Sequence, residues 1–440
     1  MENLIHVAAL DLGTSKIAGM IASKTEDGIL SILASEQISS ENCIRRGYVF
    51  NVEETTLKVS QLVSRLNRKL ESPIEKIYVG IGGQSIRTAP HTVQKSVPGG
   101  IVTQDILDSL TEEAEDFVLA SLDTLTVVSP EYYLDGQLEA NPKGATASVI
   151  EARFHLIVGR PSLKKTLFPI IEFKANLDNA GFLVSPLATA EAVLTEREKE
   201  LGCALVEFGA GLTYVSVYKG KLLRYLVTIP LGGDVITKDI CSLNMLEPEA
   251  EDLKIKSGSA LTDLDNDDPV NDVIEARADE ILENVIKQIE ASGFAQSLGA
   301  GIIITGGAAQ LKNLKESLRK KTNKEVRLAS TKRSLVNQAA TLSQDPANSS
   351  LIGLLSMGTE ECLKAKEIPV VEIGETDLFG QPLNQPEDKN KGKGKRKEKG
   401  EGEGKNFFKQ FGKKMGEISN TLSTSLFSEE AEDTEETTKK

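Results

Sequence analysis

Two segments of the chain each begin with a short apolar run that leads to an acid and a glycine turn. Residues 7–24 and 203–220 share this pattern, and in each the turn leads into a second run that alternates apolar with small or polar residues. Alternation with a period of two is typical of a β-strand with one buried face. In both segments the acid stands two residues before a glycine: Asp11 before Gly13, and Glu207 before Gly209. The repeated pattern predicts a duplicated lobe.

Other segments carry helical spacing. Apolar residues of 55–70 recur at i, i+3 and i+4, which predicts an amphipathic helix, and residues 77–81 follow it as a short apolar strand. Residues 272–289 predict a long helix. Residues 301–311 predict a buried strand that runs through a Gly-Gly turn into another helix. Strands that alternate with helices in this way indicate an α/β fold.

Residues 84–161 interrupt this alternation. The segment contains a Pro-Gly-Gly turn at 98–100, and its apolar spacing predicts a helix over 103–121. Strands are expected around 124–128 and 152–158. The segment is therefore predicted to be a small inserted domain.

Length and charge restrict the class of protein. With 440 residues and 40% apolar content, two or more domains are expected, because single cores rarely grow beyond roughly 250–300 residues. The formal net charge of −14 is spread over most of the chain and leaves no domain-wide basic face. A nucleic-acid binder is therefore not expected.

The four cysteines stand far apart without a C-x-x-C pair, so neither a disulfide framework nor a thiolate zinc site is predicted, and a cytosolic location is expected. The N-terminus lacks the pattern of a signal peptide. No apolar stretch approaches the roughly 18 residues that span a bilayer. Any membrane association is therefore expected to be peripheral.

The composition changes toward the C-terminus. Residues 377–404 are nearly devoid of apolar residues, which predicts a flexible linker, and residues 428–440 form an acidic tail. Between them, residues 405–427 predict an amphipathic helix that binds an anionic membrane surface reversibly. An alternative is that its apolar stripe packs on the protein's own core. The residues expected to contact the membrane are Phe407, Phe408, Lys409, Phe411, Lys413, Lys414, Met415, Ile418, Leu422 and Leu426.

Three glycine turns follow apolar strands, and each leaves backbone amides that no Cβ shields from a ligand. They lie at residues 11–16, 207–211 and 305–308. In the first, Thr14 and Ser15 add hydroxyl donors, Lys16 adds a cation for a terminal phosphate, and Asp11 suits magnesium held through water. One such turn fits a plain β-hairpin equally well, but three in this order favour phosphate binding.

The runs D-L-G-T-S-K, E-F-G-A-G and I-T-G-G-A-A-Q-L resemble the two phosphate loops and the adenosine loop of the actin and sugar-kinase superfamily. This resemblance implies a two-lobed actin-like (ribonuclease H-like) fold that binds ATP and magnesium. Asp11 and Glu207 would hold the magnesium through water. The residues implied to contact the nucleotide are Gly13, Thr14, Ser15, Lys16, Gly209, Ala210, Gly211, Gly306, Gly307 and Ala308.

Within that superfamily, four runs closely resemble the bacterial cell-division FtsA family. They are L-D-L-G-T-S-K-I-A, P-L-A-T-A-E-A-V-L-T at 186–195, I-P-L-G-G-D-V-I-T-K-D-I at 229–240 and A-E-D-L-K-I-K-S-G at 250–258. The resemblance extends from about residue 7 to residue 358. It implies that 186–195 is the helix between the lobes, that Gly232 and Gly233 help to close the nucleotide cleft, and that Arg277 lies near the adenosine. An alternative for Arg277 is a surface ion pair with Glu280 or another acid on the same helix.

The resemblance also implies a division into subdomains. The first lobe, 1A, would comprise 1–83, 162–200 with the interlobe helix, and a return at 341–376; 84–161 would be the inserted subdomain 1C; 201–233 and 301–340 would form 2A, and 234–300 would form 2B.

The function implied by the resemblance is an ATP-dependent polymer on the cytoplasmic face of the inner membrane at the division septum. Subdomain 2B would bind the C-terminal peptide of FtsZ and so tether FtsZ filaments. Subdomain 1C would contact neighbours in the filament and later division proteins. Alternatives are an actin-fold scaffold of a pilus or secretion platform and a small-substrate kinase, for which no catalytic carboxylate is evident.

The second phosphate loop departs from the superfamily pattern Asp-x-Gly-Gly-Gly-Thr-x-Asp. This chain has Glu207, Ala210, Leu212 and Tyr214 at the differing positions. Ala210 narrows the loop, and Tyr214 replaces a carboxylate that could orient an attacking water. Because catalysis depends on close placement of the reacting groups, slow ATP turnover or none is expected.

Overall fold

The computed structural model describes residues 4–41, 43–261, 268–337 and 341–365. The chain divides into two units, Met1–Glu367 and Ile368–Lys440. The predicted linker, amphipathic helix and acidic tail lie outside the described residues, as does the end of the predicted return to the first lobe. No helix in the described ranges is both long enough and apolar enough to cross a bilayer.

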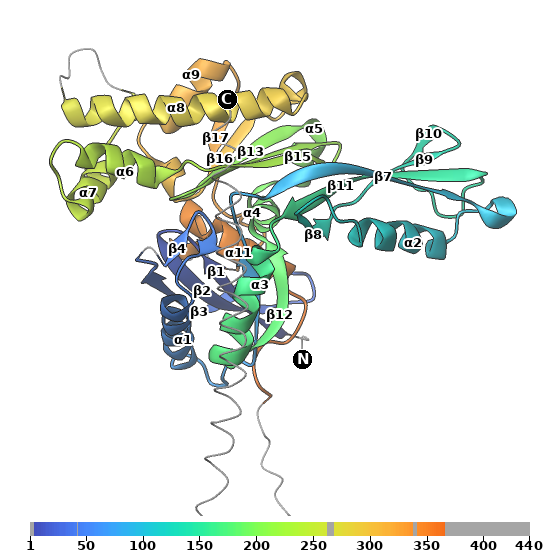
Figure 1. Cartoon of the computed structure of the whole chain (residues 1–440), viewed down its shortest axis with the longest axis horizontal. Helices are drawn as coiled ribbons and strands as arrows, with labels where there is room; N and C mark the ends of the chain where they lie inside the picture. The colour runs from blue at the N-terminus through green and yellow to red at the C-terminus, as the bar shows by residue number, and fades with distance from the viewer. Residues whose placement is uncertain (1–3, 42, 262–267, 338–340, 366–440) are drawn as a thin grey trace, which may run out of the picture. The chain divides into compact units, whose positions relative to one another are not determined.

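The first lobe is built on a five-stranded sheet in the order β12-β6-β1-β2-β3 (Figure 1). Strands β1, β2 and β3 form an antiparallel meander, and β6 and β12 continue the sheet in parallel with β1. The strands are β1 (Ile5–Leu12), β2 (Lys16–Lys24), β3 (Leu30–Ser39), β6 (Lys76–Ile81) and β12 (Asp178–Val184). The two short strands β4 (Ile44–Arg45) and β5 (Tyr48–Val49) pair separately.

Helices pack closely on this sheet where glycines allow it. Helix α1 (Val52–Asn67) lies on β2 and β3, and the methyl groups of Leu62 and Leu66 leave no room for a Cβ at Gly19. Helix α11 (Ser349–Met357) crosses α4 (Ser185–Val193) so closely that a Cβ on Gly353 would lie 1.9 Å from the carbonyl oxygen of Ala188. The helix predicted over 55–70 is thus confirmed, with both ends three residues earlier.

The second lobe repeats the first. Strands β13, β14 and β15 form an antiparallel meander, and β16 and β17 continue from β13 in parallel. The predicted duplication is therefore confirmed at the level of strand order. The strands are β13 (Cys203–Phe208), β14 (Thr213–Lys219), β15 (Leu222–Ile229), β16 (Ile302–Thr305) and β17 (Val326–Leu328).

Helices α6 (Gly233–Cys241), α7 (Glu247–Ser257) and α8 (Pro269–Ala291) follow this meander, and α8 packs on α6. The long helix predicted over 272–289 is confirmed; it begins three residues earlier because Asp268 caps it through the amide of Val270. After β16 the chain forms a short 3-10 turn, and α9 (Leu314–Thr322) begins later than predicted. The other α-helices of the two lobes, in the part of the chain that the structure describes, are α3 (Ser162–Pro169), α5 (Glu196–Leu201) and α10 (Thr341–Gln344).

The inserted segment has a core of its own, whose fully buried side chains include Phe154, Ile150 and Leu110. Its elements are β7 (Arg87–Ser96), α2 (Gln104–Glu115), β8 (Asp123–Val127), β9 (Glu131–Leu134), β10 (Gln137–Glu139) and β11 (Val149–Gly159). A single residue pair, Val227 with Arg87, joins its β7 to β15 of the second lobe, so the two sheets form one ten-stranded sheet (Figure 1).

The helix predicted over 103–121 is wrong at its C-terminal end. Helix α2 stops at Glu115, and the next residues turn away from the helix axis. The ring of Phe117 stacks on His91 with 3.9 Å between centroids, and Ala120 has a positive φ of 52°. A tertiary contact therefore overrides the helical spacing of this segment.

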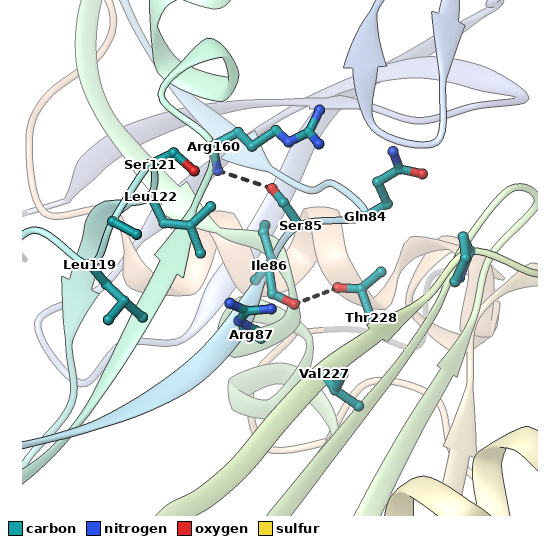
Figure 2. Close-up of a pocket in the computed structure, with 12 residues that line it drawn as sticks. Gln84, Ser85, Ile86, Arg87, Leu119, Ser121, Leu122, Arg160, Val227 and Thr228 are labelled. Carbon is teal, nitrogen blue, oxygen red and sulfur yellow. Dashed lines mark hydrogen bonds between the residues drawn. The ribbon is translucent and has the colours of Figure 1, made fainter. Parts of the chain in front are cut away.

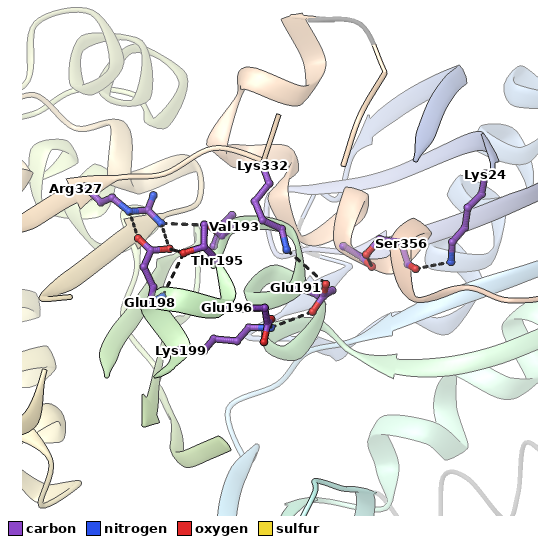
Figure 3. A network of polar contacts seen from close by, with 11 residues as sticks. Lys24, Glu191, Val193, Thr195, Glu196, Glu198, Lys199, Arg327, Lys332 and Ser356 are labelled. Carbon is purple, nitrogen blue, oxygen red and sulfur yellow. Dashed lines mark hydrogen bonds and ion pairs between the residues drawn. The ribbon is translucent and has the colours of Figure 1, made fainter. Parts of the chain in front are cut away.

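A polar network fixes the end of the connection between the lobes (Figure 3). Thr195 caps α5 through a reciprocal bond with Glu198, whose carboxylate accepts two hydrogen bonds from Arg327 of β17, at 2.7 and 2.9 Å. Burial raises the pKa of Glu198, but the hydrogen bonds from Arg327 and Thr195 outweigh it and hold that pKa below its ordinary value. Glu191 of α4 pairs with Lys199 and Lys332.

Replacement of Arg327 tests this network. Arg327→Ala removes a two-point contact from a carboxylate that is only 19% exposed, so we expect a loss of about 1–2 kcal/mol in the free energy of unfolding, measured with urea. Arg319→Ala is the matched control, because Arg319 pairs at 2.7 Å with a Glu325 that is 78% exposed. It should cost less than about 0.5 kcal/mol. Equal losses would contradict a structural role for the network.

Candidate functional site

The first glycine turn is held tightly between β1 and β2. The amide of Gly13 donates to the carbonyl of Lys16 at 2.9 Å, and Ser40 closes the turn by donating from Oγ to the carbonyl of Gly13 at 2.7 Å. A Cβ on Gly13 would lie 2.8 Å from the oxygen of Lys16. Only glycine fits this position without displacing the turn. Lys16 Nζ donates to Gln37 at 3.2 Å.

The second turn, between β13 and β14, repeats this geometry. The amide of Gly209 donates to the carbonyl of Leu212 at 2.8 Å, and a Cβ on Gly209 would lie 2.9 Å from that oxygen. The two turns meet across the lobes, because a Cβ on Gly211 would lie 2.7 Å from Oγ1 of Thr14. Their paired sequence pattern therefore corresponds to a paired position in space.

The remaining predicted loops join the second turn. The amides of Gly233 and Asp234, at the start of α6, donate to the carbonyls of Gly209 and Ala210 at 3.0 and 2.9 Å. Gly306 (φ 92°) rests on Phe208, whose oxygen would lie 2.4 Å from a Cβ there. A Cβ on Gly233 would lie 3.2 Å from that of Ala308. The predicted segments 13–16, 209–211, 232–233 and 306–308 thus converge on one place.

Two acids lie beneath these loops. Asp11 is the last but one residue of β1 and Glu207 lies in β13, and both side chains are only partly accessible. Burial raises the pKa of Asp11, opposed by Lys16 and Ser185. Burial also raises the pKa of Glu207 to about 8; Thr189 opposes this shift and Asp11 adds to it. The charged forms of both carboxylates are therefore unfavourable in the absence of a cation.

Three buried oxygens at this place make no well-aligned hydrogen bond within the described residues: Oε2 of Glu207, Oγ1 of Thr189 and Oγ of Ser185. The two hydroxyls lie close enough to Glu207 and Asp11 to lower the pKa of each acid against the effect of burial. Ser185 adjoins Asp11, since a Cβ on Gly80 would lie within 2.8 and 3.1 Å of their oxygens. Buried oxygens without partners are uncommon and indicate an absent water, ion or ligand. Oxygen atoms from two acids and two hydroxyls are the donor set that suits a hydrated magnesium ion.

Tyr214 has a structural role that the sequence did not reveal. It stands opposite Glu207 in the β13–β14 pair, and its hydroxyl accepts a hydrogen bond from the amide of Gly83 in the first lobe at 3.0 Å. Gly82 is in contact with the same hydroxyl. The position where the superfamily has a carboxylate therefore carries a bond between the lobes.

Lys254 of α7 also lies at these loops, although the sequence alone did not single it out. Its Nζ donates to the carbonyl of Gly233 at 3.1 Å, to Thr237 at 2.8 Å and to Glu251 at 2.6 Å. Only 11% of its side chain is exposed, and it lies beside the loop that Gly232 and Gly233 form. The run at 250–258 could have predicted the pair of Glu251 and Lys254, because residues three apart lie on the same face of a helix.

Arg277 makes the predicted ion pair with Glu280 on its own helix, and it also makes one with Asp239 of α6 that was not predicted. Its guanidinium contacts Asp239, with Nε 2.5 Å from Oδ2, and also Glu280. The hydrogen bond to Asp239 is the main reason that the pKa of Arg277 is raised. The pair joins α8 to α6, and a contact with adenosine stays a prediction.

Comparison with known proteins places this geometry in a family. A family model described as "Cell division protein FtsA" matches residues 204–353, and one described as "SHS2 domain inserted in FTSA" matches residues 83–158. Cell division protein FtsA of Porphyromonas gingivalis is 35% identical over 81% of this chain and 78% of that protein. The chain belongs to the FtsA family. FtsA of Neisseria meningitidis is 30% identical over 71% of this chain and 80% of that protein.

Among solved structures, the PilM–PilN type IV pilus biogenesis complex is similar with a TM-score of 0.60 and 15% identity, over 80% of this chain and 98% of that one. At this identity the likeness shows the actin-like fold alone. The predicted fold and the FtsA family are confirmed, including the inserted subdomain. A pilus scaffold is not favoured, because the more similar sequences are cell division proteins.

The raised pKa of Glu207 has a consequence for stability. The unfolded chain ionises this carboxyl near pH 4.5 and the folded chain near pH 8, so the group costs stability increasingly as the pH rises through that window. We expect Glu207→Gln to raise the melting temperature relative to wild type by a few degrees at about pH 9 and by much less at about pH 5.

The control for this substitution is Glu53→Gln, which removes one charge from the exposed side of α1. Melting curves without nucleotide or divalent ions give the comparison. A difference between Glu207→Gln and wild type that is the same at both pH values would contradict a perturbed carboxyl at this position.

Proposed function

We propose that this protein binds ATP with magnesium where the four glycine loops converge. The observation that carries this proposal is the meeting of these loops beside Asp11 and Glu207, where three buried oxygens lack a well-aligned hydrogen bond among the described residues. Backbone amides in tight glycine turns bind phosphate oxygens. Lys16 would supply a cation for the terminal phosphate, and Lys254 lies on the side of residues 232–233.

Magnesium, when bound, would neutralise phosphate charge, and Asp11 and Glu207 would hold it through its water ligands. Binding would favour the ionised form of Glu207 and so offset the cost of burying that carboxylate. Hydrolysis is proposed to be slow or absent. Tyr214 stands where the superfamily has a second carboxylate. Its hydroxyl accepts a hydrogen bond from the amide of Gly83, and burial raises the pKa of that hydroxyl above its ordinary value.

Within the FtsA family we further propose that the protein forms actin-like filaments on the cytoplasmic face of the membrane at the septum and tethers FtsZ there. Residues 234–300 would receive the C-terminal peptide of FtsZ, and the insert would meet neighbouring subunits and later division proteins. Residues 405–427 would attach the filament to anionic lipid through their apolar stripe.

The tether is tested by co-flotation of purified FtsZ with anionic vesicles in the presence of ATP. Three samples are compared: the full-length protein, a version that ends at Gly404, and no added protein. We expect FtsZ on vesicles only with the full-length protein, because the shortened version lacks the predicted membrane helix.

Flotation of the protein without FtsZ would contradict the tether. Absence of both from the vesicle fraction would contradict the membrane helix as well.

A further arm with Lys16→Ala tests whether nucleotide binding is required, and Lys315→Ala, on the surface of α9, is its control.

A further inference from the structure

A cavity of about 470 Å³ lies where the insert leaves the first lobe (Figure 2). Strands β7 and β15 pair only at Arg87 and Val227. Beside this pair, threonine side chains replace the ladder: Thr228 donates to the carbonyl of Ile86 at 2.8 Å, and the amide of Leu226 donates to Thr88 at 3.0 Å. Beyond these contacts β7 and β15 separate. The cavity opens at the point where they separate, which is here called the fork.

Two arginines mark this cavity. Arg87 begins β7 and Arg160 follows the end of β11, so the chain enters and leaves the insert beside them. The structure gives neither guanidinium an acidic partner among the described residues, and none of the twelve lining residues is acidic. Other arginines do have one: Arg153, Arg224, Arg277, Arg319 and Arg327. Arg65 and Arg68, which line a second hollow on α1, also have no acidic partner among the described residues, so the hollow at the insert is distinguished by the leucine and valine side chains beside its arginines.

The rest of the lining consists of apolar and uncharged polar side chains. Leu119 and Leu122 lie on the insert side and Val227 and Thr228 on the second-lobe side (Figure 2). Half of the lining residues are exposed: Gln84, Arg87, Ala120, Ser121, Arg160 and Pro230. Binding sites for small molecules usually enclose most of the ligand surface. This hollow is too open to do so. Its shape is better suited to side chains presented by a peptide.

We propose that this hollow, the root site, binds an acidic peptide segment of a partner protein. Carboxylates of the peptide would pair with Arg87 and Arg160, whose planar guanidinium groups suit two-point contacts. An aliphatic side chain between the carboxylates would pack on Leu119, Leu122 and Val227. Because the site touches both the insert and the second lobe, a bound peptide would hold the two together at the fork.

This proposal deepens the proposed role of the insert in meeting division proteins, and it is tested without ATP, lipid or FtsZ. The probe is a fluorescein-labelled octapeptide of alternating glutamate and leucine, titrated with the full-length protein and followed by anisotropy. A peptide with lysine in place of glutamate measures binding that does not depend on the acidic charge. We expect saturable binding of the acidic peptide alone.

The double variant Arg87→Glu/Arg160→Glu should weaken that binding by roughly tenfold or more, because both charge contacts become repulsive. Arg333→Glu, an exposed arginine elsewhere, should leave it unchanged. Both arginines at the root site are exposed, so the variants should fold, and circular dichroism checks this. Leu122→Ser is a second variant that keeps the charges and should weaken binding through lost apolar contact.

Equal affinity for the double variant and wild type, or for the two peptides, would overturn the proposal. Displacement of the acidic peptide by millimolar inorganic phosphate as efficient as displacement by unlabelled peptide would also overturn it, since the hollow would then be a site for small anions.

Discussion

The bond between Tyr214 and Gly83 links the two lobes at the floor of the glycine loops. A backbone amide that is buried without an acceptor is costly, so the first lobe depends on a side chain of the second for this bond. Around it, Thr14 contacts Gly211, and the start of α6 is hydrogen-bonded to the second turn. The loops that the two duplicated meanders carry therefore share one place, and their spacing is fixed by direct contact.

The closeness of these loops also explains why the pKa values of the two acids are raised. Burial beneath the loops raises the pKa of both Asp11 and Glu207, and the charge of Asp11 raises that of Glu207 further. Burial and mutual repulsion both favour the protonated form of Glu207. A cation and its waters would reverse this balance, and they would also supply partners for Ser185 and Thr189. These groups are unfavourable without a ligand, and the proposed magnesium ion would make their burial favourable.

Much of the fold could be predicted because it is encoded locally. The two acid-glycine turns and the long helix over 272–289 follow from spacing and from the steric demands of glycine. The end of α2 could not, because it depends on the contact of Phe117 with His91, which is distant in sequence. Within the site, the glycine loops were predictable, whereas the bond made by Tyr214 depends on how one lobe is placed against the other.

Segments of both lobes are proposed to form one nucleotide site, and hydrogen–deuterium exchange tests this directly. The protein is labelled with and without Mg·ATP, and peptides that cover residues 13–16, 209–211, 232–233 and 306–308 are compared. Slower exchange in all four segments with Mg·ATP is the predicted result. Unchanged exchange, or protection confined to the segments of one lobe, would contradict a shared site.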